Sequence, residues 1–192
     1  MESLFVSTGV VALAEIGDKT QLLAFLLATR FKKPLPIIAG ILVATILNHS
    51  LAGALGAWIT ATLSPEVLRW ILGLSFIGMA VWTLIPDKIE EEEMQVARKF
   101  GVFGATLITF FLAEMGDKTQ IATVAMAAHF PSVVMVVIGT TLGMLIADVP
   151  AVFIGDRFAA KIPMKLVHGI AAAMFAAMGV ATLLGAGATF GF

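Results

Sequence analysis

Two short segments combine ionisable side chains with apolar surroundings in a pattern that suits cation binding. They read EIGDKTQ at 15–21 and EMGDKTQ at 114–120, and apolar runs flank each on both sides. Glu15 and Asp18 are three residues apart, so on a helix they share one face, which Gln21 continues. Carboxylate, amide and hydroxyl oxygens are hard donors that suit Ca²⁺, Mg²⁺ or Mn²⁺ better than Cu⁺ or structural Zn²⁺.

The remaining composition is that of a membrane protein. Of the 192 residues, 59% are hydrophobic and 13% are charged, whereas about 25% are charged in a soluble domain. The net charge of −1 offers no basic surface for nucleic acid, and the absence of cysteine excludes thiolate metal sites and thiol catalysis. Because the N-terminus lacks a basic region and a small-residue cleavage site, we expect a retained helix there, not a signal peptide.

Six segments are long and apolar enough to span a hydrocarbon core of about 30 Å. They are 4–29, 35–61, 66–85, 100–128, 132–155 and 164–187. The alternation of an outer-membrane barrel is absent, so we predict an all-α membrane protein with six transmembrane helices. Lys and Arg gather in the first, third and fifth loops, which the positive-inside rule places in the cytoplasm, with both termini outside.

The two motifs belong to a longer internal repeat. A shift of 99 residues aligns the halves without gaps, and it also pairs Phe31 with Phe130 and Gly40 with Gly139. We predict repeats at 1–85 and 100–192 within one membrane domain, joined by a cytoplasmic linker at 86–99 that carries the acidic run 90–93. Because each repeat has three spans, the second must enter from the opposite side, so the repeats are inverted. Transporters of this kind bind substrate near the midplane between the repeats.

The predicted site draws equally on both motifs. The predicted metal ligands are Glu15, Asp18, Gln21, Glu114, Asp117 and Gln120. Four crowded carboxylates cannot all stay ionised without a counter-charge. A divalent cation supplies one, and protons supply it when the cation leaves, which is the physical basis of cation–proton exchange.

Other residues are expected to support this site. Lys19 and Lys118 point about 100° away from the neighbouring aspartates on an ideal helix, so we expect them to be structural counter-charges or to extend towards the membrane surface, and not to bind substrate. Gly17 and Gly116 permit close helix packing or a local break. The additional ligand or proton-relay candidates are Asn48, Asp148, Thr20 and Thr119.

The polar groups outside the motifs have alternative roles. For Asn48 and Asp148 the alternative is an interhelical hydrogen bond. His49, which aligns with Asp148, is expected to be a packed, hydrogen-bonded histidine.

The paired E-x-G-D-[KR]-[ST] motifs on the first and fourth of six helices resemble those of the cation/proton exchangers of the Golgi and chloroplast, a family with a bacterial branch of manganese exporters. The resemblance covers essentially the whole chain and maps onto residues 15–20 and 114–119. It implies proton-coupled Mn²⁺ export by alternating access, with Ca²⁺ as a second candidate substrate and no cofactor. Without an organellar targeting extension, the expected location is the plasma (inner) membrane of a prokaryote.

Other function classes stay open at this point. A small-solute or amino-acid exporter of similar six-helix architecture would want an apolar pocket, and a channel would need a continuous pore. No H-E-x-x-H or serine–histidine pattern supports an enzyme, so we expect none, and a purely structural membrane protein is the last alternative. The Mn²⁺/Ca²⁺ preference, the proton stoichiometry and the oligomeric state, a homo-oligomer included, are not set by the sequence.

Overall fold

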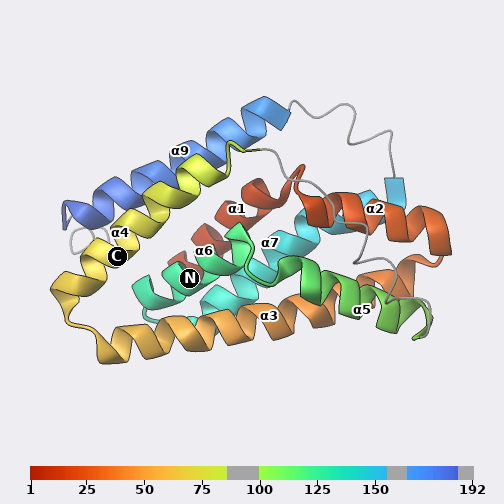
Figure 1. The fold of residues 1–192 in the computed structure, drawn as a ribbon, viewed down its shortest axis with the longest axis horizontal. Coiled ribbons are helices and arrows are strands. Elements are labelled where there is room, and N and C mark those ends of the chain that lie inside the picture. The colour runs from red at the N-terminus through yellow and green to blue at the C-terminus, as the bar shows by residue number, and fades with distance from the viewer. Residues whose placement is uncertain (86–99, 155–163, 186–192) are drawn as a thin grey trace.

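The computed structural model describes residues 1–85, 100–154 and 164–185, and within these ranges the chain is helical with no strand (Figure 1). The helices are α1 (Glu2–Glu15), α2 (Lys19–Phe31), α3 (Pro34–Thr62), α4 (Pro65–Trp82), α5 (Gly101–Glu114), α6 (Lys118–His129), α7 (Val133–Ile154) and α9 (Met164–Leu183). The all-α prediction is therefore confirmed for these residues. The predicted linker 86–99, with its acidic run 90–93, lies outside them.

Several helices have the length and composition of a membrane span. Three qualify clearly in the described part of the chain, namely Pro34–Thr62, Pro65–Trp82 and Val133–Phe153, and Gly101–Glu114 and His168–Leu183 are shorter apolar helices. Proline begins α3 and α4, where its missing N–H is not needed by the helix. Helices α3, α4, α7 and α9 correspond, in this order, to the predicted segments 35–61, 66–85, 132–155 and 164–187.

The first and fourth predicted spans are each broken into two helices. α1 ends at Glu15 and α2 begins at Lys19, while α5 ends at Glu114 and α6 begins at Lys118. Each break contains a glycine with positive φ, 85° at Gly17 and 79° at Gly116, a conformation that side chains with a Cβ disfavour. The two breaks thus have the same backbone form at corresponding places in the two halves.

The long helices of each half pack against the other half in matching pairs. α1 packs along α7, and its counterpart α5 packs along α3. A Cβ added to Gly40 in α3 would lie 2.7 Å from the Thr106 Cβ in α5, and one added to Gly139 in α7 would lie 2.6 Å from the Leu4 carbonyl oxygen in α1. These glycines lie 99 residues apart, so a missing side chain permits the same close approach twice.

Helices α4 and α9 form a separate pair that breaks this correspondence. They cross closely, because a Cβ added to Gly73 would lie 2.5 Å from the Leu183 Cγ. In this pair, α9 packs on α1, and α4 packs on α6. Among the described helices, any packing of α4 on α5 or of α9 on α2 is slight. In Figure 1 the pair lies at the upper left, away from α2 and α5 at the right.

Candidate functional site

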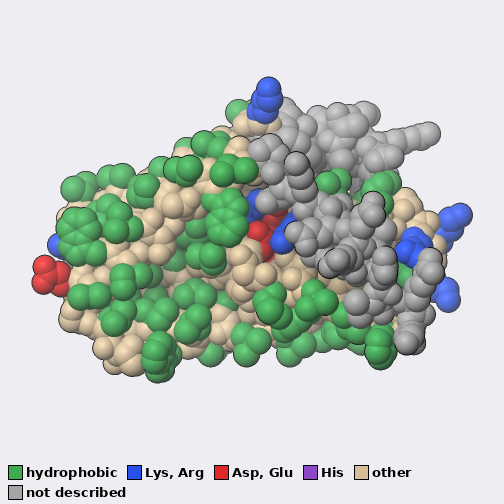
Figure 2. Space-filling view, in the orientation of Figure 1, with side chains coloured by type: hydrophobic (Ala, Val, Ile, Leu, Met, Phe, Trp, Pro, Cys, Tyr) green, Lys and Arg blue, Asp and Glu red, His purple; other side chains and the backbone are tan. Residues whose placement is uncertain are grey.

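The acidic side chains of both motifs are buried at the two helix breaks. Glu15, Asp18, Glu114 and Asp117 are all at most 3% exposed. Glu15 interacts electrostatically with the other three and with Asp148 of α7. Acidic and basic side chains show together near the centre of an otherwise largely apolar face (Figure 2). The structure therefore brings the carboxylates of the two motifs into one buried acidic cluster.

The breaks also direct helix ends towards this cluster. Glu15 and Glu114 are the last residues of α1 and α5, and Asp18 and Asp117 precede the first residues of α2 and α6. Asp117 is the N-cap residue of α6, and its Oδ1 accepts a hydrogen bond of 2.7 Å from the Lys118 backbone N–H. A helix C-terminus carries partial negative charge, so the glutamates stand where a cation is stabilised.

Gln21 and Gln120 bridge the breaks with their amides. The Gln21 Oε1 accepts from the Gly17 N–H at 2.8 Å, and the Gln120 Oε1 accepts from the Gly116 N–H at 2.7 Å. The Gln21 Nε2 also donates to the Ala147 carbonyl oxygen at 2.8 Å. These bonds hold the unwound segments in place, while ligation of a metal by either glutamine stays a prediction.

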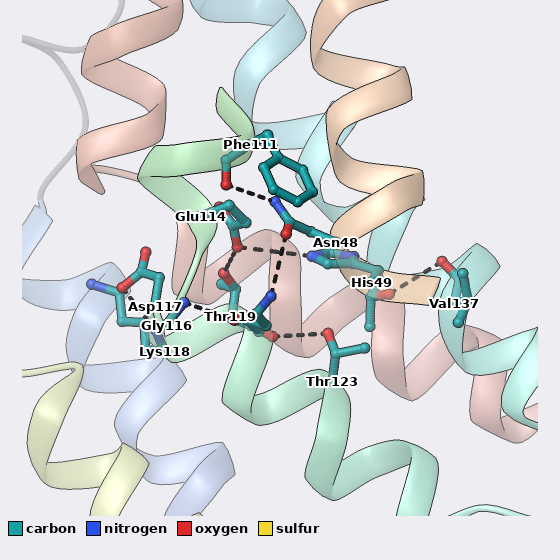
Figure 3. Close-up of polar contacts among 12 residues, drawn as sticks. Asn48, His49, Phe111, Glu114, Gly116, Asp117, Lys118, Thr119, Thr123 and Val137 are labelled. Atoms are coloured by element: carbon teal, nitrogen blue, oxygen red, sulfur yellow. Dashed lines mark hydrogen bonds and ion pairs between the residues drawn. The ribbon is translucent and has the colours of Figure 1, made fainter. Parts of the chain in front are cut away.

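Asn48 connects three helices beside the second break. Its Nδ2 donates to the Phe111 carbonyl oxygen at 3.1 Å, and its Oδ1 accepts from the Gln120 Nε2 at 3.3 Å (Figure 3). It is buried in α3. These contacts are interhelical hydrogen bonds, which was the alternative to a ligand role for this residue.

Among the buried acidic residues that the structure describes, Glu15 and Asp148 have the fewest polar contacts. Both are 0% exposed, and none of their four carboxylate oxygens has a hydrogen-bond partner among the described residues. An ionised carboxylate buried without a partner is very costly. This pair therefore needs protons or a cation.

The corresponding place in the second half is built differently. The Thr119 hydroxyl donates to Glu114 Oε1, and the Nε2 of His49 lies 3.8 Å from the same oxygen (Figure 3). The hydroxyl of Thr20, the counterpart of Thr119, is buried and has no such partner in the described ranges. Sequence reasoning had not placed His49 in the site, although its alignment with Asp148 was the available signal.

The two motif lysines also differ. Lys118 is buried, and its Nζ lies 2.7 Å from Asp18 Oδ1 in the other half. Lys19 is half-buried and interacts with Asp117 electrostatically at longer range. Within the described ranges, no three His, Asp or Glu side chains form a ready-made metal-binding group, so a bound cation would have to draw its ligands together.

Comparison with known proteins points to one family. The family model described as the divalent cation/proton antiporter GDT1 matches residues 3–91 and 102–189. A Vibrio cholerae protein described as "Putative manganese exporter" is 51% identical over 183 residues, which cover 95% of this chain and 90% of that protein. "GDT1-like protein 3" of Oryza sativa is 30% identical over 207 residues, covering 94% of this chain and 73% of that protein.

More distant relatives agree, and one of them is a GDT1-like protein of Synechocystis that is 29% identical over 186 residues, or 86% of this chain and 89% of that protein. No solved structure gives a significant match. Since the family model covers both halves and the Vibrio protein is similar over nearly its whole length, the chain belongs to the GDT1 family of divalent cation/proton antiporters.

Proposed function

We propose that this protein exports Mn²⁺ from the cytoplasm in exchange for protons, by alternating access in the plasma (inner) membrane of a prokaryote. The observation that carries the proposal is the buried cluster of carboxylates at the two helix breaks. Their hard oxygen donors suit Mn²⁺, and suit Ca²⁺ as a second substrate. The choice of manganese is supported by the description of the Vibrio relative.

The charge balance of the cluster supports coupling to protons. The carboxylates of Glu15, Asp18, Glu114, Asp117 and Asp148 interact with one another, and the motif lysines supply two positive charges. Crowded carboxylates in a low dielectric repel one another strongly unless they are neutralised. A divalent cation neutralises two charges, and protons replace it when it leaves, so the cluster alternates between a metal-bound and a protonated form.

We also propose that the six spans form two inverted repeats, with α1 plus α2 as the first span and α5 plus α6 as the fourth. The matching breaks at Gly17 and Gly116 and the reciprocal close approaches of Gly40 and Gly139 support this arrangement. With both termini outside, α1 and α6 occupy the outer half of the membrane and α2 and α5 the inner half. The alternative of a small-solute or amino-acid exporter has no comparable support, because the family is one of divalent cation antiporters.

The α4–α9 pair supports alternating access, because it occupies one of two equivalent positions. It packs on α1 and α6, and the His168 Nε2 of α9 lies 3.1 Å from the Ile16 carbonyl oxygen at the first break. The counterparts of these two residues are Arg69 and Met115, and both are exposed, Met115 at 54%. In the proposed topology the pair would close the outer half here, and the equivalent position on α2 and α5 would close the inner half.

Reconstituted transport tests the proposal. Proteoliposomes that hold the purified protein should accumulate Mn²⁺ when a proton gradient is imposed in the exchange direction, and a panel with Ca²⁺ and Mg²⁺ gives the preference. Protein-free liposomes and the Glu15→Gln variant serve as controls. Uptake that is indifferent to the gradient would reduce the mechanism to uniport, and absence of divalent cation uptake would overturn the proposal.

A further inference from the structure

His49 is a buried imidazole without the hydrogen bond that such a group normally needs. It lies in α3, is 0% exposed, and neither ring nitrogen has a hydrogen-bond partner in the described part of the chain. Burial of an unsatisfied polar group costs free energy. The expected packed, hydrogen-bonded histidine is therefore not what the described residues show.

The nearest charged group to the ring has the spacing of a shared ligand. His49 Nε2 and Glu114 Oε1 are 3.8 Å apart, which is too long for a hydrogen bond. Two donor atoms that each lie about 2.1 Å from one small divalent cation are about 3.0 Å apart at a right angle and about 4.2 Å apart across the ion. The observed separation falls between these limits, so one cation can bind both atoms with little movement.

The pseudo-symmetry shows that this imidazole is the distinctive donor of the cluster. The residue that aligns with His49 is Asp148. Asp148 interacts with Glu15, and at the equivalent place in the other half His49 lies beside Glu114. His168 at the first break donates from its Nε2 to the Ile16 carbonyl oxygen, so that nitrogen offers no lone pair, and the other ionisable donors around the breaks are carboxylates. His49 thus adds a single nitrogen to a cluster that otherwise offers oxygen.

We infer that His49 is a ligand of the transported cation, binding through Nε2 together with Glu114, and that this nitrogen selects Mn²⁺ over Ca²⁺ and Mg²⁺. This inference rests on the proposed function. Imidazole is a good ligand for transition-metal ions, whereas Ca²⁺ and Mg²⁺ take oxygen ligands almost exclusively. Binding requires the neutral ring, with the lone pair on Nε2 and the proton on Nδ1.

Pulsed electron paramagnetic resonance of bound Mn²⁺ tests this directly. The protein is produced with natural-abundance histidine and, in parallel, with ¹⁵N-histidine, and it is loaded with Mn²⁺ alone. We expect a ¹⁴N modulation that the ¹⁵N label replaces, and its loss in His49→Gln. His129→Gln is the matched control, because His129 lies at the end of α6 against Phe76 and Phe130, and it should keep the modulation.

Binding competition provides a second readout. The ratio of Mn²⁺ to Ca²⁺ affinity should fall at least about tenfold in His49→Gln, because changes in the groups that support a metal site reduce metal affinity by about this factor or more. The ratio should stay unchanged in His129→Gln. Bound Mn²⁺ without any histidine nitrogen, or an unchanged ratio, would overturn this inference and leave Mn²⁺ export intact. No binding of Mn²⁺ by the wild-type protein would overturn both. The isotope comparison uses the unaltered sequence, so a missing histidine modulation would overturn the inference even if His49→Gln does not fold.

Discussion

The Nζ of Lys118 lies 2.7 Å from Oδ1 of Asp18, and this buried ion pair joins the two halves of the chain. Each residue belongs to the motif of a different half, so the contact ties the second break to the first. Its counterpart, Lys19 with Asp117, interacts at longer range. The cluster is therefore asymmetric, although the motifs that build it are nearly identical.

Replacement of Lys118 by methionine should destabilise the protein more than the same change at Lys19. Removal of one partner from a buried ion pair leaves an uncompensated charge and costs about 3–5 kcal/mol, whereas Lys19 is half-buried. Thermal unfolding of Lys118→Met, Lys19→Met and the double variant Asp18→Asn/Lys118→Met measures this. The double variant should recover part of the loss, and equal effects of the two single lysine changes would contradict the assignment.

Glu15→Gln and Glu114→Gln should each abolish transport while the protein stays folded. Each glutamate ends a broken helix in the shared cluster. We expect the single site to need both carboxylates to bind and release the cation. Glu15→Gln should also raise the unfolding temperature without metal, because it removes the cost of keeping a buried carboxyl group protonated, and this group has no hydrogen-bond partner among the described residues. Transport in proteoliposomes and thermal unfolding of the same preparations measure both effects. Full activity in either variant would show that the two halves do not share one site.

Asp148→Asn should weaken metal binding and reduce its pH dependence. The carboxylates must release protons to bind the cation, so the apparent dissociation constant for Mn²⁺ should rise as pH falls. If Asp148 contributes one of these protons, the slope of that dependence should drop in Asp148→Asn. Metal titrations at several pH values, with Asn48→Ala for comparison, measure it.

Asn48→Ala should weaken binding moderately and leave the slope as it is, because Asn48 holds the break through hydrogen bonds and carries no proton to exchange. Unchanged affinity and pH profile in both variants would assign these residues to helix packing.

Gly116→Ala should destabilise the protein by about 1–2 kcal/mol. Gly116 has a φ of 79°, and an added Cβ would meet nothing within 4 Å, so the cost comes from the backbone conformation alone. Gly78→Ala is the matched control, because its added Cβ also meets nothing within 4 Å and its place in α4 is helical. That change should be neutral or slightly stabilising. Thermal unfolding compares them, and equal effects would show that the break tolerates a side chain.

The sequence predicted the helical class and the burial of the motifs, because apolar runs around a repeated acidic cluster leave few other arrangements. It did not predict which motif lysine would be buried, since Lys19 and Lys118 occupy equivalent positions. Nor did it place His49 beside Glu114, because a single histidine in an apolar helix has the same pattern in a packed core. Two equivalent halves also cannot reveal which of two equivalent positions α4 and α9 adopt in three dimensions.

The proposed movement of the α4–α9 pair between two positions can be tested by cross-linking, because the chain contains no cysteine. One cysteine pair replaces Ile16 and His168, which are in contact in the structure. The second pair replaces Met115 and Arg69, their counterparts 99 residues away. Both double variants should transport Mn²⁺ before treatment with a short, reducible thiol cross-linker.

Cross-linking at 16 and 168 should stop transport, and reduction should restore it, because the link holds the α4–α9 pair on the outer half. A cross-link between positions 69 and 115 requires the α4–α9 pair to move to the inner half. This cross-link should therefore form only in molecules in which the pair is still free to move. In the variant with all four cysteines, a molecule already linked at 16 and 168 should therefore not form the second link. Mass spectrometry of the linked peptides measures this, with the separate double variants as references. Both links in one molecule would show that the two contacts are compatible, and the α4–α9 pair would then not be the element that alternates.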